Sequence, residues 1–233
     1  MGGRAAASMS VLAIIPARSG SKGIPGKNFT ALLGGTSPLQ RAYRVAQSLL
    51  PDARIVITTD VDVKQYDRGR AHTTWLPRPA ELAQDDTPMI AVVQHVLEQI
   101  PGPPDQKIVL LQPTQPLRKP EHITKALQLL TPEWDSVVSV VQTVSPDELL
   151  ETRGDELKMT HGWTLEFPSR RQVLTPGYKR DGTVYAFWRR TVDKHRDIYG
   201  GQARALIIDP AETCPLDTID DWQNAERRLR ERA

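Results

Sequence analysis

The sequence predicts an α/β protein with a doubly wound, mostly parallel β-sheet. Short apolar runs rich in β-branched residues indicate buried strands at residues 11–15, 54–59, 107–112 and 136–141. Continuous apolar runs, as opposed to alternating ones, are typical of parallel strands that helices cover on both faces. Helical patterns lie between these runs, and strand–helix alternation favours a parallel sheet with right-handed crossovers.

The predicted helices begin at recognisable start signals. Ser37 suits an N-cap, and Pro38 follows at the first helical position, where proline is tolerated. The pair Thr87 and Pro88 repeats this start. The helices predicted from such signals and from apolar periodicity cover residues 37–50, 87–100, 119–130 and 217–232, the last as an exposed amphipathic helix.

The segment from about 142 to 181 breaks this alternation. Residues 148–159 read as two short pieces around a Gly-Asp turn, and a polar, aromatic stretch follows them. Strand-like runs return at residues 183–188 and 204–209. We therefore expect one domain over residues 11–233, with a small insertion at about 142–181 that covers the site or joins another subunit.

Composition excludes several classes of protein. With 39% hydrophobic and 25% charged residues the chain suits a soluble globular protein, and no apolar run approaches the length of a membrane span. The single cysteine, Cys214, excludes an intramolecular disulfide, so we expect a cytoplasmic protein. The net charge of +2 predicts neither nucleic-acid nor membrane binding. Residues 1–10 are expected to be a disordered extension or a cloning remnant, with Met9 as an alternative start.

Polar motifs gather at the predicted carboxyl ends of the strands, where open α/β sheets bind ligands. They occupy residues 18–28, 58–60, 112–118 and 209–221. The first motif is cationic, since no acidic residue precedes Asp52, and the last is acidic. Charges placed in this way suit one polyanion and its metal ion, and uneven surface charge is the alternative explanation.

The first of these motifs has the composition of a phosphate-binding loop. Its glycines let backbone N–H groups approach an anion, and its cations supply charge. These residues are Gly20, Gly23 and Gly26 with Arg18, Lys22 and Lys27. A P-loop kinase is not expected, because Ser21 replaces the first glycine of that motif and Asn28 replaces its magnesium-binding hydroxyl. A solvated glycine turn is the alternative interpretation of the residues alone.

The whole stretch "ARSGSKGIPGKN" (17–28) resembles the A-R-x-x-S-K-G-x-P-x-K-N signature of the CMP-sialic acid synthetase-like cytidylyltransferases, the acylneuraminate cytidylyltransferase family. The resemblance continues in the order of that family and covers nearly the whole chain from Val11. Its further motifs are "RPAELAQDDTP" (78–88), "LLQPTQPLR" (110–118), "RRQ" (170–172), "YKRDGTVYAF" (178–187) and "LDTIDDW" (216–222).

This resemblance implies a Rossmann-like nucleotidyltransferase fold and a CTP-dependent cytidylyltransferase. An acceptor oxygen attacks the α-phosphorus of CTP, which gives a CMP conjugate and pyrophosphate, with Mg²⁺ as cofactor. Related enzymes are often homodimers, so a homodimer is implied as well. The family's roles can be carried onto the matching positions of this sequence. The resemblance implies catalytic roles for Arg18, Lys22 and Lys27, and a metal-binding role for Asp217. It implies nucleotide binding by Arg18, Ser21, Lys22, Gly23, Lys27, Asn28, Arg78 and Asp86, and acceptor binding by Gln112, Arg171, Lys179 and Arg180.

Some of these roles are more specific. Lys22 is expected to contribute most to transition-state stabilisation, and Arg78 matches the family arginine that helps recognise cytosine, whose O2 and N3 accept hydrogen bonds. Arg118 is expected to position the loop after the strand at 107–112.

One departure from the family's pattern concerns the metal. Sialic acid enzymes carry a D-x-D pair, but here Pro215 takes the first position and only Asp217 remains. Asp60, Asp209 and Glu212 are candidate replacements, and an N-cap role is the alternative for Asp217. With the first carboxylate lost, a catalytically impaired nucleotide-binding regulatory protein is the second function considered.

A second departure concerns the acceptor. Lys179 stands where the sialic acid enzymes have an arginine that meets the substrate carboxylate, and lysine keeps the charge but loses the bidentate fork. Arg180 is adjacent, and Arg170 and Arg171 are nearby in sequence, so the acceptor remains an anion. A sialic-acid-like 2-keto-3-deoxy sugar acid, another acid and a small phosphonic acid all fit this pattern.

Overall fold

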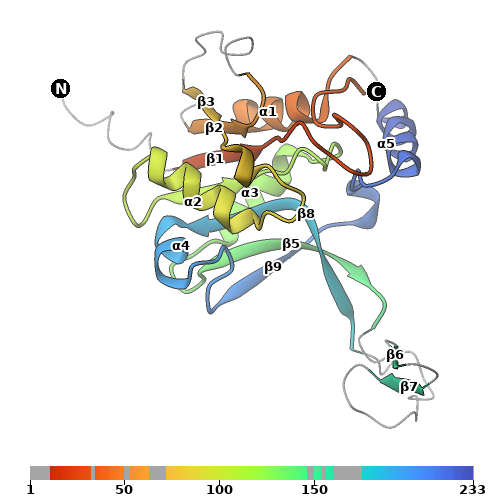
Figure 1. Cartoon of the computed structure of the whole chain (residues 1–233). Helices are drawn as coiled ribbons and strands as arrows, with labels where there is room; N and C mark the ends of the chain where they lie inside the picture. The colour runs from red at the N-terminus through yellow and green to blue at the C-terminus, as the bar shows by residue number, and fades with distance from the viewer. Residues whose placement is uncertain are drawn as a thin grey trace, which may run out of the picture.

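The computed structural model describes residues 11–32, 35–49, 53–62, 72–145, 150–153, 156–159 and 175–232. Seven strands form one sheet in the order β3-β2-β1-β4-β8-β5-β9, and β6 pairs with β7 in a separate two-stranded sheet (Figure 1). The strands are β1 Val11–Pro16, β2 Arg54–Thr59, β3 Thr73–Pro77, β4 Lys107–Leu110, β5 Ser136–Thr143, β6 Leu150–Arg153, β7 Glu156–Met159, β8 Gly177–Trp188 and β9 Ala203–Ile207.

Helices cover both faces of the large sheet, which confirms the doubly wound α/β fold. Alternate residues of β1 enter different layers: Ala13 and Ile15 belong to the core with α1 and α3, whereas Leu12 and Ile14 belong to the core with α2 and α4. Every one of these four side chains is fully buried. The helices are α1 Pro38–Leu49, α2 Met89–Gln99, α3 Pro120–Leu129, α4 Arg189–His195 and α5 Ile219–Glu231.

Strand direction is parallel among β3, β2, β1 and β4, and again between β5 and β9. Only β8 runs antiparallel to its neighbours β4 and β5 in this sheet. Its inner part is as continuously buried as the parallel strands, because helices cover both faces there too. The apolar run at 183–188 therefore does not indicate whether this strand is parallel or antiparallel to its neighbours.

Strands β5 and β8 extend into the span 142–181 that the sequence predicts as an insertion. Their ladder continues to the pair Thr143 and Gly177, and both strands project from the sheet toward β6 and β7 (Figure 1). The pairing of β6 with β7 confirms the two short pieces predicted at 148–159. Arg170 and Arg171 lie outside the described residues.

Two helix starts show how the local sequence sets the element boundaries. Ser37 and Gln40 cap α1 reciprocally, since the Gln40 N–H donates to Ser37 Oγ at 3.2 Å and the Ser37 N–H donates to Gln40 Oε1 at 2.9 Å. The cap expected at Thr87 is wrong: α2 begins after Pro88, and the Thr87 hydroxyl donates to the Glu81 carbonyl at 3.2 Å.

The strand order places a crevice where ligands bind in such folds. The chain leaves β1 toward β2 on one side and later returns to β4 on the other side, so the loops after β1 and β4 separate at this switch point. A third core cluster, formed by Leu32, Leu117, Cys214, Leu216 and Ala225, packs α5 and the segment before it against these loops. No helix in the described parts of the chain is long and apolar enough to cross a membrane.

Candidate active site

The loop after β1, residues 17–30, is held in a defined shape by its own backbone. Gly26 takes a φ of +65°, a conformation that favours glycine, and the N–H groups of Phe29 and Thr30 donate to its carbonyl. The side chain of the buried Asn28 donates from Nδ2 to the Arg18 backbone carbonyl at 2.9 Å. The backbone carbonyl of Asn28 accepts the Leu39 N–H. Asn28 thus ties the start of the loop to its end and to α1.

Two of the three predicted cations converge on one carboxylate. Arg18 forms an ion pair with Asp85 Oδ1, and Lys22 Nζ lies 3.2 Å from Asp85 Oδ2. Hydrogen bonds from Arg18 above all, and from Lys22, lower the pKa of Asp85. Asp86, the predicted nucleotide-binding acid, is exposed beside it. Asp85 is therefore the anion that both Arg18 and Lys22 bind in this structure. Ser21, which lies between these two cations in the sequence, is half-buried.

Beneath this loop lies a buried arginine. Arg78 is 7% exposed and donates from Nη2 to the Thr58 carbonyl at 2.7 Å, at the end of β2. Burial lowers the pKa of Arg78 to about 10, which leaves it charged at neutral pH. Asp60 faces the same region and accepts both the N–H and the hydroxyl of Ser19, at 2.7 and 2.6 Å. The loop after β1 is thereby fastened to the end of β2.

The third cation, Lys27, points to the C-terminal segment of the chain. Its ammonium group donates to the Leu216 carbonyl and lies 3.6 Å from Asp217 Oδ1. Gly23 packs against the same segment so closely that a Cβ at this position would lie 2.1 Å from the Asp217 backbone oxygen. Only glycine permits this approach. Two segments far apart in sequence therefore meet at Asp217.

The close contact at Gly23 makes a testable prediction. Replacement by alanine must displace either the loop or Asp217, so we expect Gly23→Ala to lower turnover about a hundredfold, as misplacement of reacting groups by roughly 1 Å does. Gly20→Ala is the matched control, because a Cβ at Gly20 meets nothing within 4 Å. Steady-state kinetics of both variants measure this, and equal activities would contradict the packing described.

A cavity of about 680 Å³ opens next to Asp217. The predicted acceptor-binding residues Gln112, Lys179 and Arg180 all line it, together with Asp217 and Pro215. Its further lining residues include Met89, Leu110, Thr114, Gln115, Asp181, Tyr185, Tyr199 and Thr213. Asp217 is therefore a residue at which contacts from the loop after β1 meet a pocket with cationic and aromatic walls.

The cationic side of this cavity is held by an aromatic pair. Arg180 donates to the Tyr199 hydroxyl, and its guanidinium carbon lies 5.4 Å from the centre of the Tyr199 ring. Tyr199 meets Tyr185 edge-on with 6.4 Å between the ring centres, and burial raises the pKa of Tyr185 to about 12. Tyr185 therefore stays a neutral phenol at physiological pH. Lys179, next to Arg180, is exposed.

Asp217 projects into solvent at the junction of loop and cavity. Its side chain is 76% exposed, and it does not cap α5, because Thr218 Oγ1 accepts the Asp221 N–H at 3.2 Å and is the N-cap. The alternative of an N-cap role for Asp217 is thus wrong. Its carboxylate is available for a ligand, a role that a helix cap would have prevented.

The candidate replacements for the missing metal carboxylate are engaged elsewhere. Asp60 holds Ser19, Asp209 accepts the Ala211 N–H at 2.8 Å, and Glu212 is paired with Lys119. No group of three or more His, Cys, Asp or Glu side chains suited to a metal occurs within the described ranges. A Mg²⁺ ion usually takes one or two carboxylates together with substrate phosphates and water. Asp217 is therefore the carboxylate that would coordinate Mg²⁺ at this site, and the phosphates of a bound substrate would have to supply further ligands.

The loop after β4 is the structural centre of the site. Arg118 is 6% exposed and donates to the carbonyls of Gln112 and Thr183, so it positions this loop against β8, as expected from the sequence. Burial lowers the pKa of Arg118 to about 10, and it remains a cation. Gln115, which the sequence analysis did not single out, is also buried here. Its hydrogen bonds run to backbone groups and a hydroxyl, which no spacing of charged residues could indicate.

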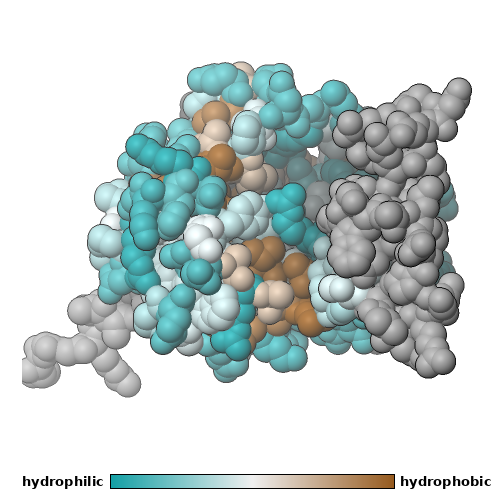
Figure 2. All heavy atoms as spheres, turned by 90° about the horizontal axis from the view of Figure 1, so that it is seen from below, coloured by the Kyte–Doolittle hydropathy of each residue, from teal (hydrophilic) through white to brown (hydrophobic). Residues whose placement is uncertain are grey.

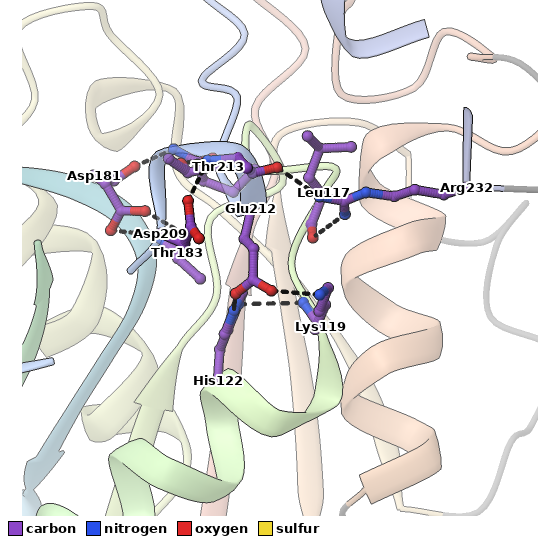
Figure 3. Close-up of polar contacts among 11 residues, drawn as sticks. Leu117, Lys119, His122, Asp181, Thr183, Asp209, Glu212, Thr213 and Arg232 are labelled. Carbon is purple, nitrogen blue, oxygen red and sulfur yellow. Dashed lines mark hydrogen bonds and ion pairs between the residues drawn. The ribbon is translucent and has the colours of Figure 1, made fainter. Parts of the chain in front are cut away.

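A polar cluster closes the far side of this loop (Figure 3). Glu212 points between Lys119 and His122. It accepts a hydrogen bond from the Lys119 ammonium group, and His122 Nε2 lies 3.0 Å from Glu212 Oε2. His122 Nδ1 accepts the Lys119 backbone N–H at 3.3 Å, so the ring proton that is donated to Glu212 lies on Nε2. The hydrogen bond from Lys119, and then that from His122, lower the pKa of Glu212 to about 2.

This lowered pKa predicts a pH dependence of stability. A carboxylate with a depressed folded-state pKa stabilises the fold above its unfolded pKa, here near 4.5, and that contribution disappears as the pH falls toward 2. We expect Glu212→Gln to unfold at a lower temperature than the wild type at pH 7, and the difference to shrink between pH 5 and pH 3. Glu98→Gln, which changes an exposed acid on α2, is the control. Calorimetric melts that stay equally separated at every pH would refute this.

Comparisons with known proteins show the family of this chain. The chain matches the sequence model of the cytidylyltransferase family over residues 12–227. It is 32% identical over 237 residues to the CMP-N,N'-diacetyllegionaminic acid synthase of Legionella pneumophila, with 95% of this chain and 97% of that protein aligned. It is 26% identical to an N-acylneuraminate cytidylyltransferase of Escherichia coli over 92% of this chain and 51% of that protein. The chain thus spans about half the length of the latter relative.

Solved structures show the same fold at low sequence identity. CMP:2-keto-3-deoxy-manno-octonic acid synthetase complexed with CTP matches with a TM-score of 0.70 and 16% identity, over 96% of this chain and 99% of that one. 4-Diphosphocytidyl-2C-methyl-D-erythritol synthase from Anaerococcus prevotii matches with a TM-score of 0.62 and 12% identity, over 96% and 97% of the two chains. The chain therefore belongs to the CMP-sialic acid synthetase-like cytidylyltransferases, which are nucleotidyltransferase enzymes.

Proposed function

We propose that the enzyme transfers CMP from CTP to a sugar acid and releases pyrophosphate. The position of Asp217 is the observation that carries this proposal. Its backbone packs on Gly23 of the loop after β1, its carboxylate lies 3.6 Å from Lys27 Nζ, and it lines the cavity that holds Gln112 and Arg180. A triphosphate on the loop and an acceptor in the cavity would therefore meet beside one carboxylate.

In this proposal the triphosphate of CTP replaces Asp85 as the partner of Arg18 and Lys22. Both cations already converge on the oxygens of a carboxylate, and phosphate oxygens present a larger negative charge. Arg78 would meet the cytosine, while Ser21, Gly23, Asn28 and Asp86 would complete the nucleotide site. Lys22 and Lys27 would stabilise the charge that develops on the phosphates as the acceptor oxygen attacks.

Asp217 would hold the Mg²⁺ ion that accompanies CTP. The ion would neutralise phosphate charge and polarise the reacting phosphoryl group. The chain's own part is to fix that carboxylate: the Leu216 N–H donates to the Thr114 carbonyl at 3.0 Å, and Leu216 is fully buried. Asp217 is thereby held at the end of a packed segment.

The acceptor would be a 2-keto-3-deoxy sugar acid whose carboxylate binds Arg180 and Lys179, with Gln112 on its hydroxyl groups. A cavity of about 680 Å³ has the size of a typical small-molecule site, and a small phosphonic acid would fill only part of it. The relative from Legionella pneumophila, which is similar over nearly its full length, is named for a sugar acid of this class. Arg171, outside the described residues, is a further proposed contact.

We also propose a cytoplasmic homodimer. Figure 2 shows an apolar area on the face of the molecule that is seen from below. Two large apolar side chains are exposed near the ends of β5 and β9: Val144, which follows β5, is 54% exposed, and Ile207, the last residue of β9, is 60% exposed. Exposed apolar areas of this kind mark interaction sites, and Val144 lies at the root of the predicted insertion. Light scattering at micromolar concentration should give the mass of two chains, and a monomer would refute the dimer.

The decisive test of the proposed function is an acceptor panel. The enzyme is incubated with CTP, Mg²⁺ and legionaminic, sialic or 2-keto-3-deoxy-octonic acids, or with small phosphonic acids, and pyrophosphate is measured. We expect release with a sugar acid and CTP but not with ATP, GTP or UTP. Release with phosphonic acids alone would correct the acceptor class. Binding of CTP by calorimetry without turnover of any acceptor would instead favour a regulatory protein impaired by Pro215.

A further inference from the structure

Gln115 occupies a singular position within the loop after β4. Its side chain is 3% exposed, and it lies between two segments that the chain brings together from far apart. One is the part of strand β8 at Asp181, and the other is the extended segment at Thr213 and Cys214, before Asp217. Asp181 and Thr213 are both labelled in the close-up of Figure 3.

Both ends of the Gln115 amide are used. The NH₂ group donates to the Asp181 carbonyl, 66 residues away in sequence. The carbonyl oxygen accepts two donors, the Thr213 hydroxyl at 2.9 Å and the Cys214 N–H at 3.3 Å. A primary amide is the side chain that offers a donor and a two-fold acceptor at one planar end. Gln115 therefore links these two segments through a single rigid group.

Each linked segment carries a residue of the proposed reaction. Asp181 directly follows Arg180, which faces the acceptor cavity, and Cys214 lies three residues before Asp217. Gly182, which follows Asp181 in β8, has a φ of +78°. A Cβ at Gly182 would lie 2.5 Å from Gln112 Oε1, so this part of β8 is tightly packed against the loop after β4. Any movement of the Gln115 amide would change the separation of Arg180 and Asp217.

We propose that Gln115 is a positioning residue, which fixes the acceptor-binding part of β8 relative to the carboxylate of Asp217. This inference rests on the proposed CMP transfer and adds to it the residue that sets the alignment of the two substrates. Gln115 lines the acceptor cavity, but its side chain is 3% exposed and both ends of its amide bind the protein. Its contribution is geometric, because reacting groups displaced by about 1 Å lose about a hundredfold in rate.

The chemistry of the amide dictates the test variants. Gln115→Met has similar volume but removes the donor and the acceptor together. Thr213→Val removes one of the two donors to Gln115 Oε1 and keeps nearly the same shape, whereas Thr213→Ser keeps the hydroxyl. Gln106→Met is the matched control, since Gln106 is a buried amide that binds Arg189 at the opposite end of β4.

The experiment measures kcat, the KM of the acceptor, the Mg²⁺ activation constant and the Kd of CTP without metal, alongside the unfolding temperature. For Gln115→Met we expect kcat to fall about 10- to 100-fold and the acceptor KM and Mg²⁺ constant to rise, with the Kd of CTP unchanged within about twofold. Thr213→Val should show a smaller loss of kcat, which Thr213→Ser should restore. Gln106→Met should lower the unfolding temperature and leave kcat unchanged.

Four outcomes separate this inference from the proposed function. A wild type that releases no pyrophosphate with any acceptor overturns the proposed function and this inference with it. An active wild type with an equally active Gln115→Met variant overturns the inference alone. The same holds if Gln106→Met loses as much kcat as Gln115→Met, or if Thr213→Ser behaves like Thr213→Val, because the effect would then follow stability rather than alignment.

Discussion

Replacement of Lys22 by methionine is expected to lower kcat by about 10²- to 10³-fold, the range found when one preorganised donor to a developing charge is removed. Lys22 lies at the tip of the loop after β1, where its side chain is 84% exposed and its ammonium group reaches the same carboxylate as Arg18. It contributes little packing to the core. The loss should therefore appear in catalysis, and the unfolding temperature should stay within about a degree of the wild type.

Lys125→Met is the control for this variant, because Lys125 is an exposed lysine on α3 that does not line the cavity beside Asp217. Both variants lose one positive charge, so bulk electrostatic attraction of CTP changes equally. If Lys22→Met retained more than about a tenth of the wild-type kcat, transition-state stabilisation would have to come from Arg18 and Lys27 instead.

Asp217→Asn is expected to have an effect of similar size. Asp181 and Asp217 both line the cavity, but Asp217 is the one whose carboxylate lies beside a cation of the loop after β1, Lys27. Asparagine keeps the shape of this side chain while removing its charge. We expect kcat to fall at least about a hundredfold at millimolar Mg²⁺ and partial recovery at higher concentration, because a neutral oxygen binds Mg²⁺ more weakly than a carboxylate does. Activity titrated against Mg²⁺ measures this directly.

The control for Asp217→Asn is Asp220→Asn, three residues later and exposed in the first turn of α5. Both changes remove one negative charge from the same region. An Asp217→Asn enzyme with a normal Mg²⁺ titration would assign the metal to another carboxylate, and equal effects of the two substitutions would reduce the role of Asp217 to general electrostatics.

Strands buried on both faces could be predicted from the sequence, since a continuous apolar run has few other stable placements. This holds for β1, β2, β4 and β5. The edge strand β3, Thr73–Pro77, was missed because an edge position needs less apolar cover, and its residues are half-exposed. The short helix α4 was missed for a related reason: Arg189 and Thr191 provide two of its three buried side chains, so it lacks an apolar stripe.

Within the site, the sequence placed the cationic loop and the acidic segment correctly at strand ends, but not the contacts between them. Asp85 and Asp86 are adjacent and chemically equal, and only the turn after Ala80–Leu82 decides that Asp85 meets Arg18. Gln115 binds largely to backbone groups, which every residue possesses. Contacts of that kind leave no trace in residue type and appear only once the chain is folded.

The most direct measurement follows the α-phosphate of CTP. The enzyme is given CTP labelled at the α-phosphorus, Mg²⁺ and the sugar acid that supports pyrophosphate release, and the products are separated and identified by mass and by phosphorus NMR. Transfer of CMP predicts that the label appears in a CMP–sugar conjugate, in amounts equal to the pyrophosphate released. Label found only in CTP, or in free CMP whether or not acceptor is present, would contradict the transfer of CMP to an acceptor in the cavity beside Asp217.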